Sequence, residues 1–147
     1  MIYTIGIDPD SDKHGVAIYV DGKLETIDSL GEVEIVQMVN DLRCNVTQDI
    51  VFGIEDVMAN QFIYRANQKS SKAAQSRVGI SVGRCQQAQV SLMRWLDHLD
   101  VEYRLFKPQR GNWAEKKAHF ERVTGWTARS NKDTRSAAFF GYLALGS

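Results

Sequence analysis

Three acidic residues stand where predicted strands end or a predicted helix begins. Asp8 closes a first apolar strand, Glu55 closes a later one, and Asp133 opens the last helix. Neighbouring parallel strands end at the same edge of a sheet, so Asp8 and Glu55 should lie side by side there. Two such carboxylates repel each other and raise at least one pKa unless a cation lies between them. An oxygen-only cluster favours Mg²⁺ or Mn²⁺, so the three acids predict a divalent metal site.

Each acid also has a purely structural interpretation. Asp8 lies in an Asp-Pro-Asp sequence typical of turns, and Glu55 could be the polar end of a buried strand. Ser130 and Asp133 match a helix capping box, which needs no function. Only the joint pattern favours a site.

Small residues accompany these acids. Gly6 and Gly53 each lie two residues before an acid and on the same face of their strands, which predicts that a helix packs closely there. Asp133 heads a helical stripe that is expected to face the core and contains Ser136, Ala137, Phe140 and Ala144.

The charges cancel over the whole chain but are unevenly spread. Residues 1–56 hold twelve acids and three bases, whereas residues 57–96 hold six bases and no acid. Residues 97–147 hold nine bases and six acids. This distribution suits an enzyme that binds metal in one place and a polyanion in another, although chance clustering on a neutral surface is the alternative.

The 147 residues, 44% of them hydrophobic, predict a single α/β domain spanning 1–147. We expect a mixed five-stranded sheet flanked by helices, with three antiparallel strands followed by strand–helix alternation. The strands are predicted at 3–8, 16–20, 24–27, 50–55 and 101–106, with a hairpin at Asp21-Gly22, and helices at 33–42, 71–96, 112–124 and 130–145.

Two cysteines, Cys44 and Cys85, are too few for a disulfide scaffold and are predicted to be buried free thiols in a reducing compartment. No apolar run is long enough to span a membrane, and no secretory leader is recognisable. A cytoplasmic location is therefore expected.

Several short motifs resemble the RuvC branch of the RNase H-like nucleases. They are Ile5-Gly6-Ile7-Asp8-Pro9, Gly15-Val16-Ala17-Ile18, Ile54-Glu55, Met58-Ala59-Asn60 and the helix that starts at Asp133. The resemblance covers most of the chain in element order. It implies an RNase H-like fold and a dimeric, Mg²⁺-dependent endonuclease that resolves Holliday junctions, with Mn²⁺ as a substitute metal. The compact form resembles resolvases carried by bacteriophages, with a bacterial host gene as the alternative.

Carried over by position, the resemblance assigns Asp8, Glu55 and Asp133 as metal ligands and catalytic residues. The family has a second acid one helical turn after the third, where this chain has Ser136. Asp10, Asp56 or the Ser136 hydroxyl are the alternative fourth groups.

The resemblance also implies two-metal phosphodiester hydrolysis and binding of branched DNA. The catalytic lysine of the family falls in the region of Lys107, Lys116 and Lys117. The aromatic residues Phe62, Tyr64 or Trp113 would wedge between or stack on bases of an opened junction, or serve as apolar anchors in the core or the dimer interface. A homodimer would form through the long central helix. The residues expected to contact DNA are Arg65, Lys69, Lys72, Arg77, Lys107 and Lys116.

Three other interpretations remain open. The Gly-Ile-Asp opening also occurs in actin-like ATPases, which need a second domain that this length does not provide. A non-catalytic DNA-binding relative is the second. The third is a nuclease of the same fold that acts on flaps, forks or RNA–DNA hybrids.

Overall fold

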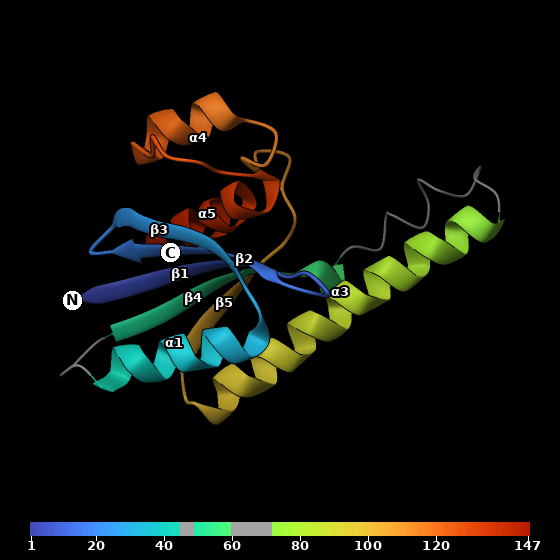
Figure 1. The fold of residues 1–147 in the computed structure, drawn as a ribbon, viewed down its shortest axis with the longest axis horizontal. Helices are drawn as coiled ribbons and strands as arrows, with labels where there is room; N and C mark the ends of the chain where they lie inside the picture. The colour runs from blue at the N-terminus through green and yellow to red at the C-terminus, as the bar shows by residue number, and fades with distance from the viewer. Residues whose placement is uncertain (45–48, 60–71) are drawn as a thin grey trace.

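The computed structural model describes residues 1–44, 49–59 and 72–147. A mixed five-stranded sheet in the order β3-β2-β1-β4-β5 forms its centre (Figure 1). The first three strands are antiparallel, and β4 and β5 run parallel to β1. The expected fold class is therefore confirmed. The elements are β1 Ile2–Asp8, β2 His14–Val20, β3 Lys23–Leu30, α1 Glu32–Cys44, β4 Asp49–Glu55, a short 3-10 helix η1 Val57–Ala59, α3 Lys72–His98, β5 Glu102–Phe106, α4 Lys117–Thr124 and α5 Lys132–Leu145.

Helices cover both faces of the sheet (Figure 1). Alternation along β1 sends Ile5 and Ile7 to one face, where they pack with α1 and the second half of α3. The other face carries α5 and α4, whose core includes Trp113. Trp113 is only 3% exposed, so of its two expected roles the structure supports the core anchor.

Helix α5 lies directly against the sheet because glycines leave room for its backbone. A Cβ atom on Gly6 would lie 1.8 Å from the carbonyl oxygen of Ala137, and one on Gly53 would lie 2.4 Å from that of Phe140. Both distances are far below van der Waals contact. The close helix approach predicted from these two glycines is confirmed.

The two ends of α5 are fixed by different groups. At its start, Asn131 Oδ1 accepts the backbone N–H of Thr134, and the Thr134 hydroxyl accepts that of Asn131. The predicted capping box of Ser130 and Asp133 is therefore wrong by one position, because Asn131 holds the extended backbone that a cap requires. This cap does not use the Asp133 carboxylate.

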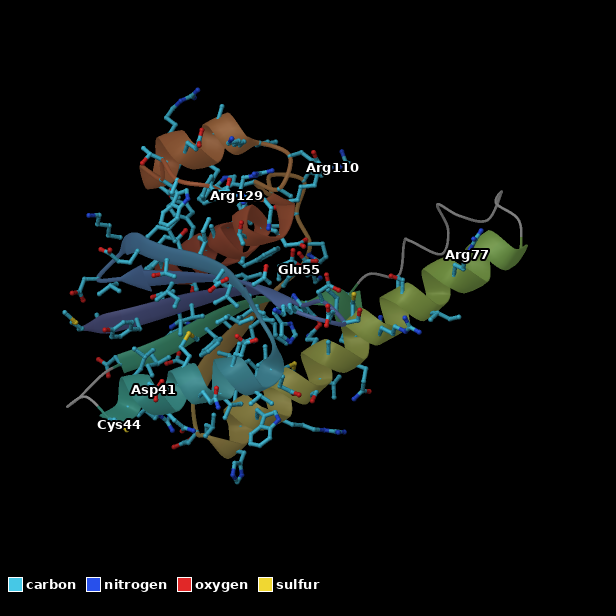
Figure 2. The ribbon with its side chains drawn as sticks, viewed as in Figure 1. Asp41, Cys44, Glu55, Arg77, Arg110 and Arg129 are labelled. Carbon is cyan, nitrogen blue, oxygen red and sulfur yellow. The ribbon has the colours of Figure 1, made fainter. Side chains whose placement is uncertain are left out.

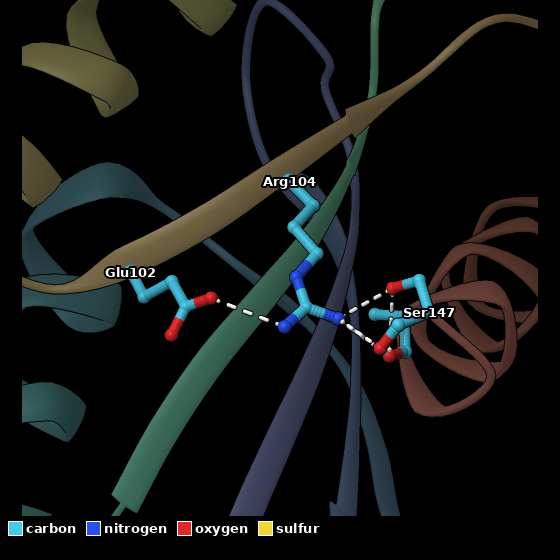
Figure 3. A network of polar contacts seen from close by, with 4 residues as sticks. Glu102, Arg104 and Ser147 are labelled. Carbon is cyan, nitrogen blue, oxygen red and sulfur yellow. Dashed lines mark hydrogen bonds and ion pairs between the residues drawn. The ribbon is translucent and has the colours of Figure 1, made fainter.

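The C-terminal end of α5 is tied to the edge strand β5. Arg104 donates hydrogen bonds to the carbonyl oxygens of Ala144, at 3.3 Å, and Ser147, at 2.6 Å, and pairs with Glu102 (Figure 3). These bonds satisfy carbonyl groups that a helix end leaves free. The helix that carries Asp133 is thus held at both ends.

Of two further local predictions, one is confirmed and the other is wrong. The Asp21-Gly22 hairpin is confirmed, with both residues at positive φ. Helix α4 begins five residues after the predicted start at Asn112, because the Asn112 side chain accepts the Ala114 N–H and closes a turn instead.

The expectation of buried thiols is wrong. Cys44 is exposed at the end of α1, and Cys85 is half-buried and lines a cleft. No helix in the described ranges is long and apolar enough to cross a membrane.

Helix α3 is one continuous helix of 27 residues, about 40 Å long at 1.5 Å per residue. Its second half packs on the sheet through Leu92 and Leu96, which are fully buried. Its first half projects away from the sheet and its covering helices (Figure 1). We call residues 72–84 the α3 arm.

Candidate metal and nucleic-acid site

The two strand-end acids lie next to each other on the face that α5 covers. Ile7 pairs with Ile54 in parallel register, so Asp8 and Glu55 occupy the following positions of adjacent strands. Both share the face of the glycines beneath α5. They line one cleft of about 270 Å³ together with Pro9, Asp10, Val57, Ser81, Val82 and Cys85.

Asp133 reaches this end of the sheet over Gly15. Gly15 pairs with Asp8 across β1 and β2, and a Cβ atom on it would lie 2.4 Å from the Asp133 carbonyl oxygen and 3.3 Å from Asp133 Cβ. Only glycine permits this approach. Gly15 was recognised only as part of a short motif, and its place one residue before an apolar strand was the available signal for this role.

Burial and mutual repulsion set the electrostatics of the acids. Burial, followed by the charges of Glu55 and Asp133, raises the pKa of Asp8 to about 8. Burial raises the pKa of Glu55 to about 7. Within the described part of the chain, the one group that lowers the pKa of Asp8 is the Ser136 hydroxyl, through a hydrogen bond. No cationic side chain there offsets the repulsion.

This donor set fits a hard divalent cation in its chemistry. The ligand atoms would all be carboxylate oxygens, and a bound cation would favour the ionised form of both acids. Among residues 1–44, 49–59 and 72–147, however, no three His, Cys, Asp or Glu side chains gather closely enough to enclose one ion. Asp133 is therefore an exposed electrostatic neighbour of a half-buried Asp8–Glu55 pair, and the three do not form a closed cage.

The alternative fourth groups differ in their contacts. Asp56 Oδ1 accepts hydrogen bonds from Gln89 and from the Met58 N–H, and Asp10 Oδ1 accepts the Ser11 N–H. Among the three alternatives, the Ser136 hydroxyl is the group that lowers the pKa of Asp8.

Gln89, which sequence reasoning missed, joins α3 to the turn after Glu55. Its side chain is fully buried. Its Oε1 accepts the Val57 N–H at 2.8 Å and the Met58 N–H at 3.3 Å, and its Nε2 donates to Asp56 at 3.0 Å. An amide in the middle of a helix carries no sequence signal for such a role.

Basic residues flank the acids from two directions. Figure 2 shows Glu55 at the end of the sheet from which α3 projects, with Arg110 on one side and Arg77 out along the α3 arm. Arg77, Lys107 and Lys116 are exposed. Lys107 follows Phe106, the residue paired with Glu55, whereas Lys116 Nζ lies 3.4 Å from the Arg110 carbonyl oxygen.

Most of the remaining residues that were predicted to contact DNA lie outside the described part of the chain. Arg65, Lys69, Phe62 and Tyr64 lie outside the described residues, and Lys72 is the first residue of α3. The ion pairs within the described ranges join Arg104 to Glu102 and Lys132 to Glu115. Arg77 and Arg84, the described bases of the α3 arm, therefore form no ion pair with an acid in the described ranges.

Comparison with solved structures identifies the fold. The structure of Thermus thermophilus RuvC in complex with a Holliday junction substrate matches over 100% of this chain and 98% of its own, with a TM-score of 0.62 and 14% identity. A second Thermus thermophilus RuvC structure matches over 99% and 96%, with a TM-score of 0.51 and 16% identity. No protein-family model matches the sequence, and no curated protein matches it significantly. The chain therefore has the RuvC-type RNase H-like fold.

Proposed function

We propose that this protein is a divalent-metal-dependent endonuclease that cleaves branched DNA, with four-way junctions as the leading substrate. The observation that carries the proposal is the half-buried Asp8–Glu55 pair, whose carboxyl pKa values are raised to about 8 and about 7 in a cleft. Holding two repelling carboxyl groups together costs free energy of folding. Acids with perturbed pKa values in a cleft are typical of functional sites. The RuvC-type fold supports the choice of reaction.

Asp8 and Glu55 would hold the cation, Mg²⁺ or in its place Mn²⁺, with Asp133 joining them from α5. When bound, the metal would lower the pKa of an attacking water and stabilise the leaving 3′ oxygen. The chain itself supplies the rest. Gly15 lets Asp133 approach, and Asp8 and Glu55 lie half-buried in the cleft. Lys107, next to the partner of Glu55, is our choice among the three candidate lysines for contact with the scissile phosphate.

The DNA backbone would lie across the α3 arm and the loop after β5. Arg77 on the arm and Arg110 on the loop flank Glu55 on different sides (Figure 2). Phosphates on such residues release counterions, so affinity should fall steeply with salt.

We also propose that the protein acts as a homodimer that is joined through α3. Ile80 on the arm is 56% exposed, and Val82 is half-buried. A four-way junction has two symmetry-related strands to cut, and a two-fold dimer places one site on each.

A DNA-binding protein without cleavage activity is the second candidate. It is favoured by the absence, among the described residues, of any group of three acids gathered around one point. Under this alternative the protein binds junctions, and divalent metal changes nothing.

Cleavage assays with Mg²⁺ on a four-way junction, beside linear duplex, flap, fork and RNA–DNA hybrid controls, test the proposal. We expect junction cleavage that is lost in Asp8→Asn with junction binding kept, because only the metal ligand changes. Asp41→Asn is the matched control, since Asp41 lies on α1 away from Glu55 (Figure 2). Unchanged cleavage in Asp8→Asn would place the chemistry elsewhere, and binding without any cleavage would support the second candidate.

A further inference from the structure

One face of α3 carries basic and aromatic side chains well beyond the arm. Arg77, Arg84, Ser91 and His98 follow one another at intervals of seven residues, which is close to two helical turns, so they share a face. Trp95 joins this face because it lies four residues after Ser91. The helix contains no acid before its last two residues. The face therefore continues from the arm onto the half of α3 that packs on the sheet.

Two hollows lie along this face. The first has a volume of about 560 Å³, and its lining includes Ser11, Asp12, Arg84 and Ser91. The second has a volume of about 320 Å³ and is lined by Ser91, Arg94, Trp95 and His98. Because Ser91 lines both, the two hollows adjoin and form one track along the helix.

The track begins beside the candidate metal site. The loop between β1 and β2 contributes Pro9 and Asp10 to the metal cleft and Ser11 to the first hollow. Cys85 is on the wall of the cleft, and Trp95 lies ten residues further along α3, about 15 Å away at 1.5 Å per residue. Figure 1 shows this helix running from the arm past the end of the sheet to lie beside α1. A chain that leaves the cleft can therefore follow α3 to Trp95.

Trp95 offers an aromatic surface at the far end of the track. Its side chain is 42% exposed, although it is a large apolar residue. The His98 ring lies 6.1 Å from it, with an angle of 83° between the two planes. Rings that are nearly perpendicular do not stack flat on each other, so His98 supports the indole without taking the place of a stacked ring.

The charges along the track favour an anionic chain. Arg84 and Arg94 are exposed, and neither forms an ion pair within the described ranges. Two acids lie nearby: Asp12 lines the first hollow, and Glu32 accepts a hydrogen bond from the Ser91 hydroxyl. Arginines that track a phosphate backbone beside an aromatic ring on which a base stacks are the combination that binds single-stranded nucleic acid.

We propose that this track, from Arg84 to His98, binds an unpaired DNA strand of the branched substrate, with one base stacked on Trp95. An unpaired base can turn its ring face to the indole, whereas a base inside a duplex is already stacked between its neighbours. The inference rests on the proposed function, since it takes branched DNA as the substrate. The two arginines favour phosphates over an apolar protein partner.

Fluorescence anisotropy with labelled oligothymidylate, in the presence of a chelator, measures binding without cleavage. Trp95→Ala should weaken this binding by about 5- to 150-fold, the effect of losing one stacked base. Trp95→Phe should keep most of the affinity because it keeps an aromatic ring. Val123→Ala is the matched control, since Val123 is 40% exposed and lies on α4, on the other face of the sheet (Figure 1). Binding of linear duplex should be the same in Trp95→Ala as in the parent.

Tryptophan fluorescence reports the stacking itself. Of the three tryptophans, Trp113 is only 3% exposed, and the Trp126 indole N–H donates to the Arg129 carbonyl oxygen. Oligothymidylate should therefore quench mainly Trp95, and the quenching should disappear in Trp95→Phe while anisotropy still detects binding.

Three results would overturn the track: a parent that binds no oligothymidylate, parent-like affinity in Trp95→Ala, or equal quenching in the parent and Trp95→Phe. A changed oligomeric state of Trp95→Ala in sedimentation would assign Trp95 to a protein contact and would also overturn it. A parent that binds oligothymidylate through Trp95 but never cleaves a junction would overturn the proposed function and leave the track standing.

Discussion

The strand-end site and the α3 arm are built on opposite principles. At the site, the α5 backbone touches strands at Gly6, Gly15 and Gly53, leaving no room for even one methyl group. On the arm, a Cβ atom added to Gly83 would meet nothing within 4 Å, and Ile80 is 56% exposed. At the site, close packing of α5 on the strands holds the acids together against their repulsion. The α3 arm instead leaves basic and apolar side chains exposed, where a partner could contact them.

The largest expected difference between the two regions is in the free energy of unfolding when one methyl group is added to each. Gly6→Ala should lower the free energy of unfolding by about 3 kcal/mol or more, because Ala137 backbone rather than a movable side chain blocks the new Cβ. Gly83→Ala should raise it by about 0.5–1 kcal/mol through helix propensity alone. Urea unfolding of both variants beside the parent measures this. Equal effects would erase the contrast between the two regions.

The raised pKa values of Asp8 and Glu55 predict an unusual pH dependence without divalent metal. The folded protein holds protons that the unfolded chain releases above about pH 4, so stability should fall as pH rises through about 7 and 8. Mg²⁺ should reduce this loss by favouring the ionised acids.

Thermal unfolding between pH 5 and pH 9, with Mg²⁺ or with chelator, measures this dependence. A change of 1 kcal/mol should move Tm by roughly 3–6 °C in a domain of this size. Asp8→Asn should flatten the curve obtained in chelator, and Asp41→Asn should not. A rise in Tm with pH in the parent would contradict the burial of these acids.

The α3 arm should carry the dimer contact. Ile80→Glu places a charge at the exposed apolar position and should convert a dimer into a monomer with little change in monomer stability. Sedimentation at micromolar concentration, with Asn40→Glu at an exposed position of α1 as the control, provides the measurement. A parent that stays monomeric with junction DNA would refute the dimer.

Gln89 joins α3 to the turn after Glu55, so its loss should affect both stability and the site. Gln89→Leu leaves the Val57 and Met58 N–H groups without their acceptor and should cost about 1–3 kcal/mol of stability. It should also lower kcat more than junction affinity, since the turn after Glu55 loosens. Gln87→Leu, on the exposed side of the same helix, is the matched control. Equal behaviour of the two variants would mean that Gln89 does not couple α3 to the site.

The smallest effect concerns phosphate contacts on α3. Replacing Arg77 and Arg84 with glutamine should lower the slope of log affinity against log salt by about two units, one for each lost contact. Fluorescence anisotropy with junction DNA over a series of salt concentrations measures the slope. A parent-like slope would move DNA binding away from this part of the arm.

The strands were predictable because their signals are local. The alternation along 3–8 and the apolar run 50–54 were enough to place Asp8 beside Glu55. Gly6 and Gly53 predicted that a helix packs closely on the same face. The sequence Ser130-Asn131-Lys132-Asp133 offers two competing caps, and tertiary packing rather than local pattern selects Asn131.

Long-range polar contacts were beyond prediction. Asn112 meets Ser136 across 24 residues, and Gln89 meets Val57 across 32. Neither pair leaves a periodic trace, so Asn112 was interpreted as the start of a helix. Asp133 was chosen from a pattern, but its approach to Asp8 depends on Gly15, whose partner lies far along the chain.

The most direct test of the central claim is a crystal structure of the protein grown with Mn²⁺, in which anomalous scattering locates the ion. We expect an Mn²⁺ peak in the cleft, within about 2.0–2.3 Å of carboxylate oxygens of both Asp8 and Glu55, the range expected for hard divalent ions. The peak should vanish in Asp8→Asn crystals. Saturating Mn²⁺ that leaves the cleft without anomalous density, or density held by other residues, would contradict a metal-dependent nuclease built on these acids.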